Sequence, residues 1–302
     1  MCKSNLRQSA NLIYGSYIAF FACVVLISSG AIAQSIPDNE VSAFELAQLT
    51  VQPGEQVSGE IPVSSGTASN PEASFIPVTI THGPKPGPVL ALIAGIHGSE
   101  YAPIMAMQGL PELIDPASLS GTLIVVHVAN MPAFQGRTIY FGPGDLKNLN
   151  RSFPGVADGT ITERIAYTLT QQVMMRSDYL IDIHAGDGNE KLRPSYSAYY
   201  AEAGGETVVQ ESRRIAVAFG LDTIVQFAGS YDSAEDAIYT SAQAVTLGIP
   251  AMDVESGELA RTDGAYVDPI IAGVLSVLRE LNMIAGEPDL PPNPLFISDR
   301  AR

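Results

Sequence analysis

The chain has 302 residues, with 32 acidic against 16 basic side chains, and a net charge of −16. Such an excess of negative charge makes nucleic acid and anionic membrane surfaces poor partners. Cys2 and Cys23 are the only cysteines and both lie in the first 33 residues, so cysteine catalysis by the remaining chain is excluded. The length suits one large α/β domain with a substantial core.

The first 33 residues have the pattern of a cleaved secretory signal. Lys3 and Arg7 precede an apolar run over 17–27, and small residues follow at 31–33, with no acidic residue in the stretch. We therefore expect a periplasmic or secreted protein whose mature chain, residues 34–302, does not stay inserted in a membrane. The alternative is an uncleaved anchor, but the apolar run barely reaches the roughly 20 residues that a membrane helix needs.

Composition divides the rest of the chain into three parts. Residues 34–71 are rich in Ser, Pro, Gly and Glu and indicate a leader followed by an N-terminal hairpin, with 56–63 as one possible strand. Residues 72–285 are expected to form the main domain. Residues 286–302 contain three closely spaced prolines and are expected to form a tail.

Short β-rich apolar runs alternate with helical patterns along the main domain. Strands are predicted at 75–80, 89–93, 122–128, 180–183, 223–227 and 251–254, and helices at 99–113, 161–176, 205–219, 233–247 and 266–284. Thr160 and Glu163 form a capping box for the second of these helices. The alternation predicts an α/β fold with a mixed, mostly parallel sheet flanked by helices, whose ligands bind beyond the carboxyl ends of the strands.

Three metal-ligating side chains follow two of these strands. His97 and Glu100 stand in Gly95-Ile96-His97-Gly98-Ser99-Glu100, and His184 ends the run 180–184. Two imidazoles and a carboxylate are the ligands of hydrolytic zinc sites, which keep the fourth position for water. The pattern therefore predicts a metallohydrolase with one Zn²⁺. Asp182 shares the strand face of His184 and is either an orienting carboxylate for an imidazole or a plain residue of the sheet end.

Polar residues that suit a carboxylated substrate occur between these motifs. Asn150 and Arg151 offer an amide beside a guanidinium, a set of donors matched to a carboxylate. Arg137 is a candidate for stabilising the carbonyl oxygen as it becomes an oxyanion. Glu255 ends the strand at 251–254 and is expected to carry the proton in catalysis, with Asp253, on the same strand face, as its rival.

Other polar residues have weaker patterns. His82 is expected at the surface of a turn, and His127 inside the sheet with a hydrogen bond. The loop 187–194 is either solvated or an acidic selector for a substrate amine. Three tyrosines are candidate donors to a tetrahedral intermediate, and the sequence does not choose among them: Tyr231, Tyr239 and Tyr266.

Taken in order, these motifs resemble the succinylglutamate desuccinylase/aspartoacylase family of the zinc carboxypeptidase group; they are the segments 95–100, 150–151, 182–184 and 253–257. The resemblance covers roughly residues 72–284. The runs 148–155 and 159–164 are most similar to the branch that contains N-acetyl-diaminobutyrate deacetylases.

The resemblance implies a role for each candidate residue. Zinc would be held by His97, Glu100 and His184. Glu255 would be the catalytic carboxylate and Arg137 would polarise the scissile carbonyl, while Asn150 and Arg151 would bind the substrate carboxylate. Family members usually continue into a C-terminal β-rich domain that covers the site, and this domain is expected to be missing here.

The leading hypothesis is a zinc amidohydrolase that removes an acyl group from an N-acyl amino acid. Its partner would be a small N-acylated amino acid or a short peptide. One alternative is an exported metallocarboxypeptidase that acts on peptides or cell-wall fragments, because the same ligands serve both reactions. Another is a non-catalytic protein that binds a carboxylated ligand.

Overall fold

The computed structural model describes residues 41–67, 72–192 and 195–299. The expected signal segment, residues 1–33, lies outside this part of the chain. Among the residues described, no helix is both long and apolar enough to cross a lipid bilayer.

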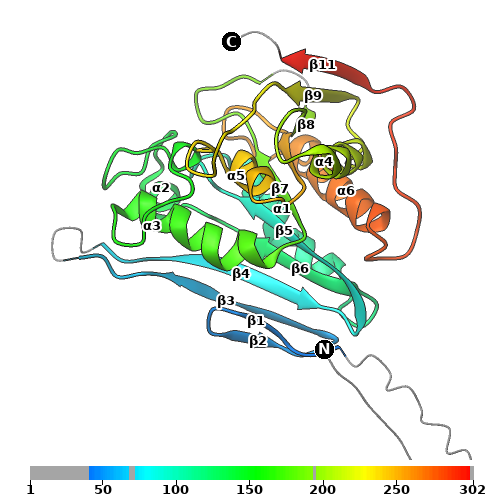
Figure 1. Ribbon diagram of the computed structural model, residues 1–302, viewed down its shortest axis with the longest axis horizontal. Coiled ribbons are helices and arrows are strands. Elements are labelled where there is room, and N and C mark those ends of the chain that lie inside the picture. Colours follow the sequence, from blue (N-terminus) through cyan, green and yellow to red (C-terminus); the bar gives the residue numbers. More distant parts are fainter. Residues whose placement is uncertain (1–40, 68–71, 193–194, 300–302) are drawn as a thin grey trace, which may run out of the picture. The chain divides into compact units, whose positions relative to one another are not determined.

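A nine-stranded mixed sheet is the central element, in the order β11-β9-β8-β10-β7-β5-β6-β4-β3 (Figure 1). Its strands are β3 (Glu55–Val63), β4 (Ser74–His82), β5 (Lys85–Ala94), β6 (Ser120–Val126), β7 (Tyr179–His184), β8 (Tyr196–Tyr200), β9 (Thr223–Phe227), β10 (Ala251–Glu255) and β11 (Leu295–Asp299). The four neighbours β10, β7, β5 and β6 run parallel, so their carboxyl ends meet at one edge of the sheet. A separate short hairpin joins β1 (Phe44–Leu46) and β2 (Leu49–Val51).

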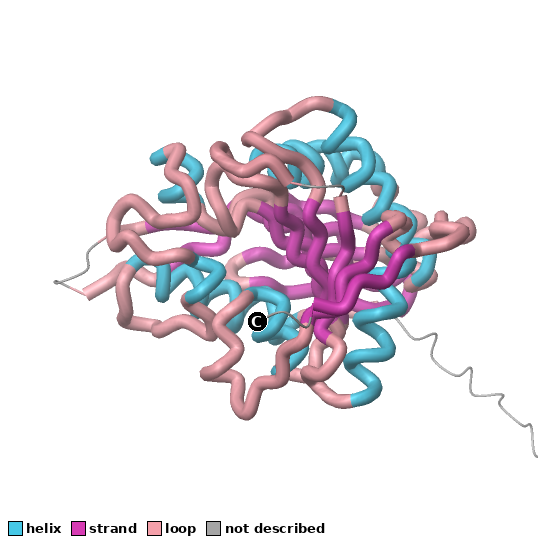
Figure 2. Tube along the Cα trace, turned by 90° about the horizontal axis from the view of Figure 1, so that it is seen from above, coloured by secondary structure: helices cyan, strands magenta, loops and turns pink. Residues whose placement is uncertain are grey.

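Helices cover both faces of this twisted sheet (Figure 2). They are α1 (Tyr101–Gly109), α2 (Met131–Gly136), α3 (Ile161–Thr168), α4 (Glu206–Ala218), α5 (Thr240–Thr246) and α6 (Gly264–Glu280). One core contains buried residues of α3 and α5 together with Val208 of α4, and the other contains those of α1 and α6 and the later buried apolar residues of α4. Alternation along β5 explains the division, since Ala91 and Ile93 enter the first core and Leu90 and Leu92 the second. The predicted fold class is confirmed.

The predicted elements agree with the structure in position more than in length. The helix expected at 233–247 is helical only from Thr240, because the residues before it form irregular turns. The helix expected at 161–176 starts as predicted, with the Thr160 amide donating to Glu163 Oε2 at 2.8 Å, and continues past α3 in short irregular turns. Two strands, β8 and β11, and helix α2 were not predicted.

Strands pair across both of the boundaries expected for the main domain. All nine residues of β3 pair with β4, so the division expected at residue 71 falls inside a pair of strands in the main sheet. The expected proline-rich tail contributes β11, which lies parallel to β9. Its prolines precede the strand and leave Leu295–Asp299 free to pair.

His82 was expected at the surface and is instead buried, with 6% of its surface exposed. It is the last residue of β4, where its Nδ1 lies 2.8 Å from Thr122 Oγ1 and its Nε2 lies 2.9 Å from the Ser42 carbonyl oxygen. Because these two partners come from distant segments, the turn-like sequence around His82 did not reveal them.

Arg164 in α3 is the largest side chain that is fully buried. Its guanidinium donates to the carbonyl oxygens of Ser64 at 3.1 Å, Gly159 at 2.7 Å and Glu72 at 2.5 Å. Hydrogen bonds from a charged donor are stronger than neutral ones, and a buried charge without them is very costly. Arg164 therefore ties the chain on either side of the β3-β4 connection to α3.

We predict that Arg164→Met lowers the free energy of unfolding by about 2–4 kcal/mol, because three carbonyl groups lose a charged donor. Denaturant unfolding followed by circular dichroism measures the change. Arg176→Met, at an exposed arginine, is the matched control and should change stability by no more than about 0.5 kcal/mol. Equal stability of the Arg164 variant and the wild type would contradict the role given to the three hydrogen bonds of Arg164.

Candidate functional site

Local backbone geometry brings His97, Glu100 and His184 to the carboxyl edge of the sheet. After β5, Gly95 adopts φ +70°, a left-handed conformation that glycine tolerates best, and the chain turns there. A Cβ at Gly98 would lie 2.2 Å from the amide nitrogen of Phe134, so this loop packs directly against the backbone of α2. Glu100 immediately precedes α1, and His184 is the last residue of β7.

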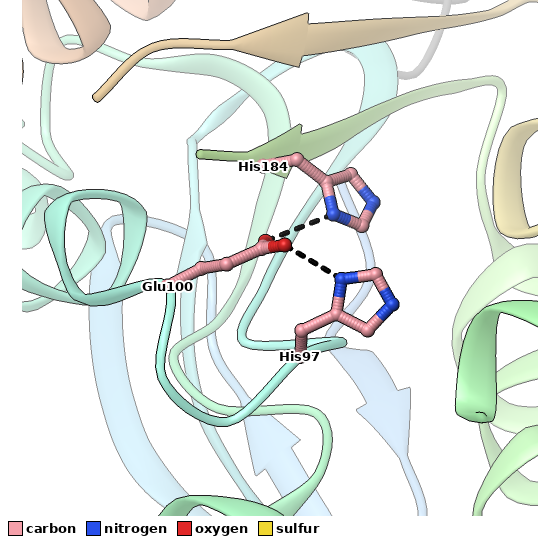
Figure 3. A group of neighbouring side chains, drawn as sticks. All are labelled: His97, Glu100 and His184. Carbon is pink, nitrogen blue, oxygen red and sulfur yellow. Dashed lines mark hydrogen bonds and ion pairs between the residues drawn. The ribbon is translucent and has the colours of Figure 1, made fainter. Parts of the chain in front are cut away.

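The three side chains converge on one another (Figure 3). Glu100 Oε1 lies 2.6 Å from His97 Nδ1, and Glu100 Oε2 lies 2.9 Å from His184 Nδ1. All three are buried, and one candidate ligand atom from each lies within 4.8 Å of the others. The predicted ligand set is therefore brought together by the fold.

The outer nitrogen of each imidazole has its own acceptor. His184 Nε2 lies 2.9 Å from Asp182 Oδ2, and His97 Nε2 lies 3.1 Å from Asn148 Oδ1. When Nε2 carries the proton in a neutral ring, Nδ1 presents a lone pair. The two lone pairs then face the Glu100 carboxylate, and a cation between them satisfies all three groups. The chemistry of this donor set fits a divalent metal ion, with Asp182 and Asn148 orienting the ligands.

The charges around the cluster favour the same conclusion. Burial works to raise the pKa of Glu100, but the two histidines outweigh it and lower the pKa to about 2. Burial works to lower the pKa of His184, yet Asp182 and Glu100 raise it well above its usual value. Carboxyl groups thus dominate this edge of the sheet, and they attract positive charge.

Two further carboxyl groups lie on the neighbouring strand β10, whose Asp253 and Glu255 are in register with Asp182 and His184. Burial raises the pKa of Asp253 to about 7 and that of Glu255 to about 8. The Ser241 hydroxyl lies 2.7 Å from both oxygens of Asp253. Glu255 Oε2, in contrast, is buried without a hydrogen-bond partner among the described residues. Of the two rivals, Glu255 is therefore the one that keeps a carboxylate oxygen without a partner among the described residues.

The residues predicted to bind the substrate carboxylate, Asn150 and Arg151, are neighbours in one short 3-10 turn, Leu149–Arg151. Asn150 Oδ1 accepts hydrogen bonds from Thr240 N at 2.9 Å and Thr240 Oγ1 at 3.1 Å, so its oxygen has a structural partner. The Arg151 side chain is exposed and lines a pocket of about 360 Å³. Asn148 lines the same pocket and contacts His97, so the pocket adjoins the histidine cluster.

Arg137 caps the carboxyl end of α2 with φ +51° and is exposed. Within the described part of the chain, its side chain makes no hydrogen bond or ion pair with His97, Glu100 or His184. Its assignment to the scissile carbonyl stays a prediction.

Comparison with known proteins identifies the family. Residues 86–281 match the family model for the succinylglutamate desuccinylase/aspartoacylase catalytic domain, which is more than half of the chain. The chain belongs to this family. The resemblance drawn from the motifs is thereby confirmed.

One curated relative is the N-alpha-acetyl-L-2,4-diaminobutyric acid deacetylase of Halomonas elongata, 41% identical over 115 residues. The match covers 38% of this chain and only 33% of that protein, so it spans a third of the relative's length. It agrees with the deacetylase branch indicated by the sequence.

Solved structures of the family share the fold. A succinylglutamate desuccinylase/aspartoacylase from Rhodobacter sphaeroides has a TM-score of 0.69 at 24% identity and covers 81% of this chain and 73% of its own. The ectoine utilization protein EutE from Ruegeria pomeroyi, in its product-bound form, has a TM-score of 0.70 at 23% identity, covering 86% and 75%.

Sequence reasoning missed several residues around the site of this family member. The hydrogen bond that Asn148 Oδ1 accepts from His97 Nε2 joins residues 51 positions apart, and only the place of Asn148 in the run 148–155 hinted at a role. The ring of Tyr140 meets that of His97 edge-on, with centroids 5.9 Å apart. Tyr140 belongs to none of the motifs, so the sequence gave no sign of this contact.

The loop after His184 is exposed at Gly188, Asn189 and Lys191, as expected of a solvated loop, but its first residue is not. Asp187 is buried, and its carboxylate accepts hydrogen bonds from Ser99 Oγ, from Tyr140 N at 3.0 Å and from Gly188 N at 2.7 Å. Asp187 is therefore a structural contact between this loop and the start of α1. Residues 193–194 of the loop lie outside the described part of the chain.

The remaining candidates are explained by local contacts. His127 Nε2 lies 2.8 Å from Thr79 Oγ1, the hydrogen bond expected for it, although the residue stands just beyond β6. Tyr266 donates to Glu258 Oε1 at 3.1 Å. Tyr239 lies under Arg151, with the guanidinium carbon 4.2 Å from the ring centroid.

We predict that the protein binds one divalent metal ion and that His97→Ala and His184→Ala abolish the binding. Asn148→Leu should weaken it about tenfold, because the outer contacts of ligating histidines typically contribute 10–100-fold. Asn148→Asp keeps an acceptor for His97 and is the matched control. Competition of zinc against a chromophoric chelator measures each affinity, and a correctly folded wild type without affinity would contradict the metal centre.

Proposed function

We propose that the protein is a zinc-dependent amidohydrolase that removes the acyl group from an N-acyl amino acid. The observation that carries the proposal is the convergence of His97 Nδ1, His184 Nδ1 and the Glu100 carboxylate in a buried cluster. Family membership and the partial match to a deacetylase support the same reaction class.

Zinc in such a site supplies a nucleophile at neutral pH and a Lewis acid for the acyl carbonyl. Asp182 and Asn148 keep the two imidazoles oriented by holding their Nε2 atoms. A cation on the neighbouring cluster would favour the ionised form of Glu255. The Glu255 carboxylate then accepts the proton of the attacking water and delivers it to the nitrogen of the departing amine. The proton therefore passes from water to Glu255 and from Glu255 to the amine, and Glu255 is a carboxylate again at the end of the reaction.

Arg151 and Asn150 distinguish an amino acid from a simple amide. The Arg151 guanidinium offers paired donors to the carboxylate of the amino acid, and the Asn150 amide nitrogen offers another, since only its oxygen is engaged by Thr240. The pocket beside Arg151 has room for the rest of a small substrate. Arg137 is assigned the developing oxyanion, on family resemblance alone.

The first test is a panel of N-acetyl and N-succinyl amino acids, including Nα-acetyl-diaminobutyrate, assayed beside dipeptides and longer peptides. We expect release of free amine from at least one acyl amino acid, loss of activity with a chelator, and recovery with zinc. Amine release is measured with a fluorogenic reagent. Hydrolysis of peptides alone would replace the proposal with a carboxypeptidase, and tight binding without turnover would replace it with a binding protein.

Glu255→Gln is the control that links activity to the site. General acid–base catalysis contributes about 10²–10⁴-fold, so kcat should fall by that factor while bound zinc stays unchanged. Asp253→Asn is the matched variant on the same strand, and its effect should be smaller because Ser241 already holds that carboxyl group. A reversed order would assign the proton transfer to Asp253.

We also propose that residues 1–33 direct export and are removed after Ala33. The basic start, the apolar run and the small residues before Gln34 support this. Intact mass spectrometry of the protein from the periplasm should give the mass of a chain that begins at Gln34. Such a chain has 269 residues and a formal net charge of −18. A full-length chain in the membrane fraction would favour an anchor instead.

A further inference from the structure

We propose that Tyr239 is a positioning residue that holds the Arg151 guanidinium in the orientation that binds the substrate carboxylate. The proposal rests on the proposed function, in which Arg151 has that role. It assigns Tyr239 an effect on substrate affinity and not on the chemical step.

The segments 150–153 and 238–240, which are distant in sequence, meet at three places around Arg151 and Tyr239. The Phe153 amide donates to the Ile238 carbonyl oxygen at 3.3 Å, and the Thr240 amide donates to Asn150 Oδ1 at 2.9 Å. Between these contacts, the guanidinium carbon of Arg151 lies 4.2 Å from the centroid of the Tyr239 ring. The stacking is therefore fixed on both sides by hydrogen bonds that include backbone atoms.

Arg151 needs such support because it is exposed. A free arginine side chain has many rotamers, and a ligand that binds it must offset the loss of that freedom. The guanidinium carbon lies over the Tyr239 ring, and Nη1 donates to the Asn150 carbonyl oxygen at 2.6 Å. These contacts fix the plane of the guanidinium and use one of its five N–H groups.

Tyr239 is itself held in place. It precedes the first turn of α5, is half-buried, and packs against the core on that face of the sheet. A tyrosine ring loses little conformational entropy when it forms a contact, so it makes a rigid support.

The same turn of α5 reaches the catalytic strand. Ser241, two residues after Tyr239, contacts the carboxylate of Asp253 on β10 at 2.7 Å. Residues 239, 240 and 241 thus contact Arg151, Asn150 and Asp253 in turn. The start of α5 sets the position of the carboxylate-binding group relative to the strand that carries Glu255.

The first measurement is the NMR order parameter of the Arg151 Nε–H bond in the zinc-loaded protein, which needs neither substrate nor turnover. Tyr239→Leu should lower it toward values typical of a free surface arginine, and Tyr239→Phe should retain it because the ring remains. Phe227→Leu is the matched control, since Phe227 is a partly buried aromatic residue that packs against the same core. An order parameter that is unchanged in Tyr239→Leu would overturn the proposal.

The second measurement compares the best N-acetyl amino acid of the panel with its decarboxylated analogue, which for N-acetyl-L-alanine is N-ethylacetamide. Tyr239→Leu should raise KM for the carboxylated substrate about three- to tenfold and change kcat less than twofold, as expected for weakened stacking on a cation. The kcat/KM of the analogue should not change. A fall in kcat, or an equal loss for the analogue, would overturn the proposal.

A double-mutant cycle separates positioning from general damage to the fold. In the Arg151→Met background, Tyr239→Leu should cause no further loss of kcat/KM, because the group that it positions is absent. Additive losses would overturn the proposal. If no acyl amino acid is turned over, the proposed function fails, and the order parameter still decides whether Tyr239 restrains Arg151.

Discussion

The contact of one carboxylate with two imidazoles is the constraint on which the site depends. Glu100 lies between His97 and His184, and all three are buried. Buried charges are stable only when partners surround them. The parallel alignment of β5 and β7 supplies this arrangement, since it places the two chain segments that carry the histidines at the same edge of the sheet.

The surrounding residues hold the side chains and the backbone of this cluster in place through hydrogen bonds. Asp182 and Asn148 hold the outer nitrogens of the imidazoles, and Asp187 ties the loop after His184 to Ser99, next to Glu100. Each of these groups is polar and lies in or beside the core, where it would be destabilising without its partner. Their positions are thus determined by one another, and the geometry of the cluster follows from the hydrogen bonds around it.

The sequence predicted what depends on local pattern. Apolar runs located the central strands, and the short spacing of His97 and Glu100 located a pair of candidate metal ligands, because both features lie within a few residues. The sequence did not predict β11, since its prolines suggested a tail, nor the burial of His82, whose partners are Thr122 and Ser42. Features that arise from pairing between distant segments are not encoded in any one stretch.

The same distinction explains why the sequence pointed to Arg151 as a candidate for substrate binding but gave no sign of its contact with Tyr239. The run Asn148 to Gly155 marks a functional loop, but nothing within it shows what supports the guanidinium. The support comes from the start of α5, about 90 residues later, through contacts that include backbone atoms and a ring face. Such contacts place few demands on residue type, except at the ring itself. In this chain the start of α5 therefore contacts the proposed carboxylate-binding arginine without contacting His97, Glu100 or His184 through any hydrogen bond of residues 239–241.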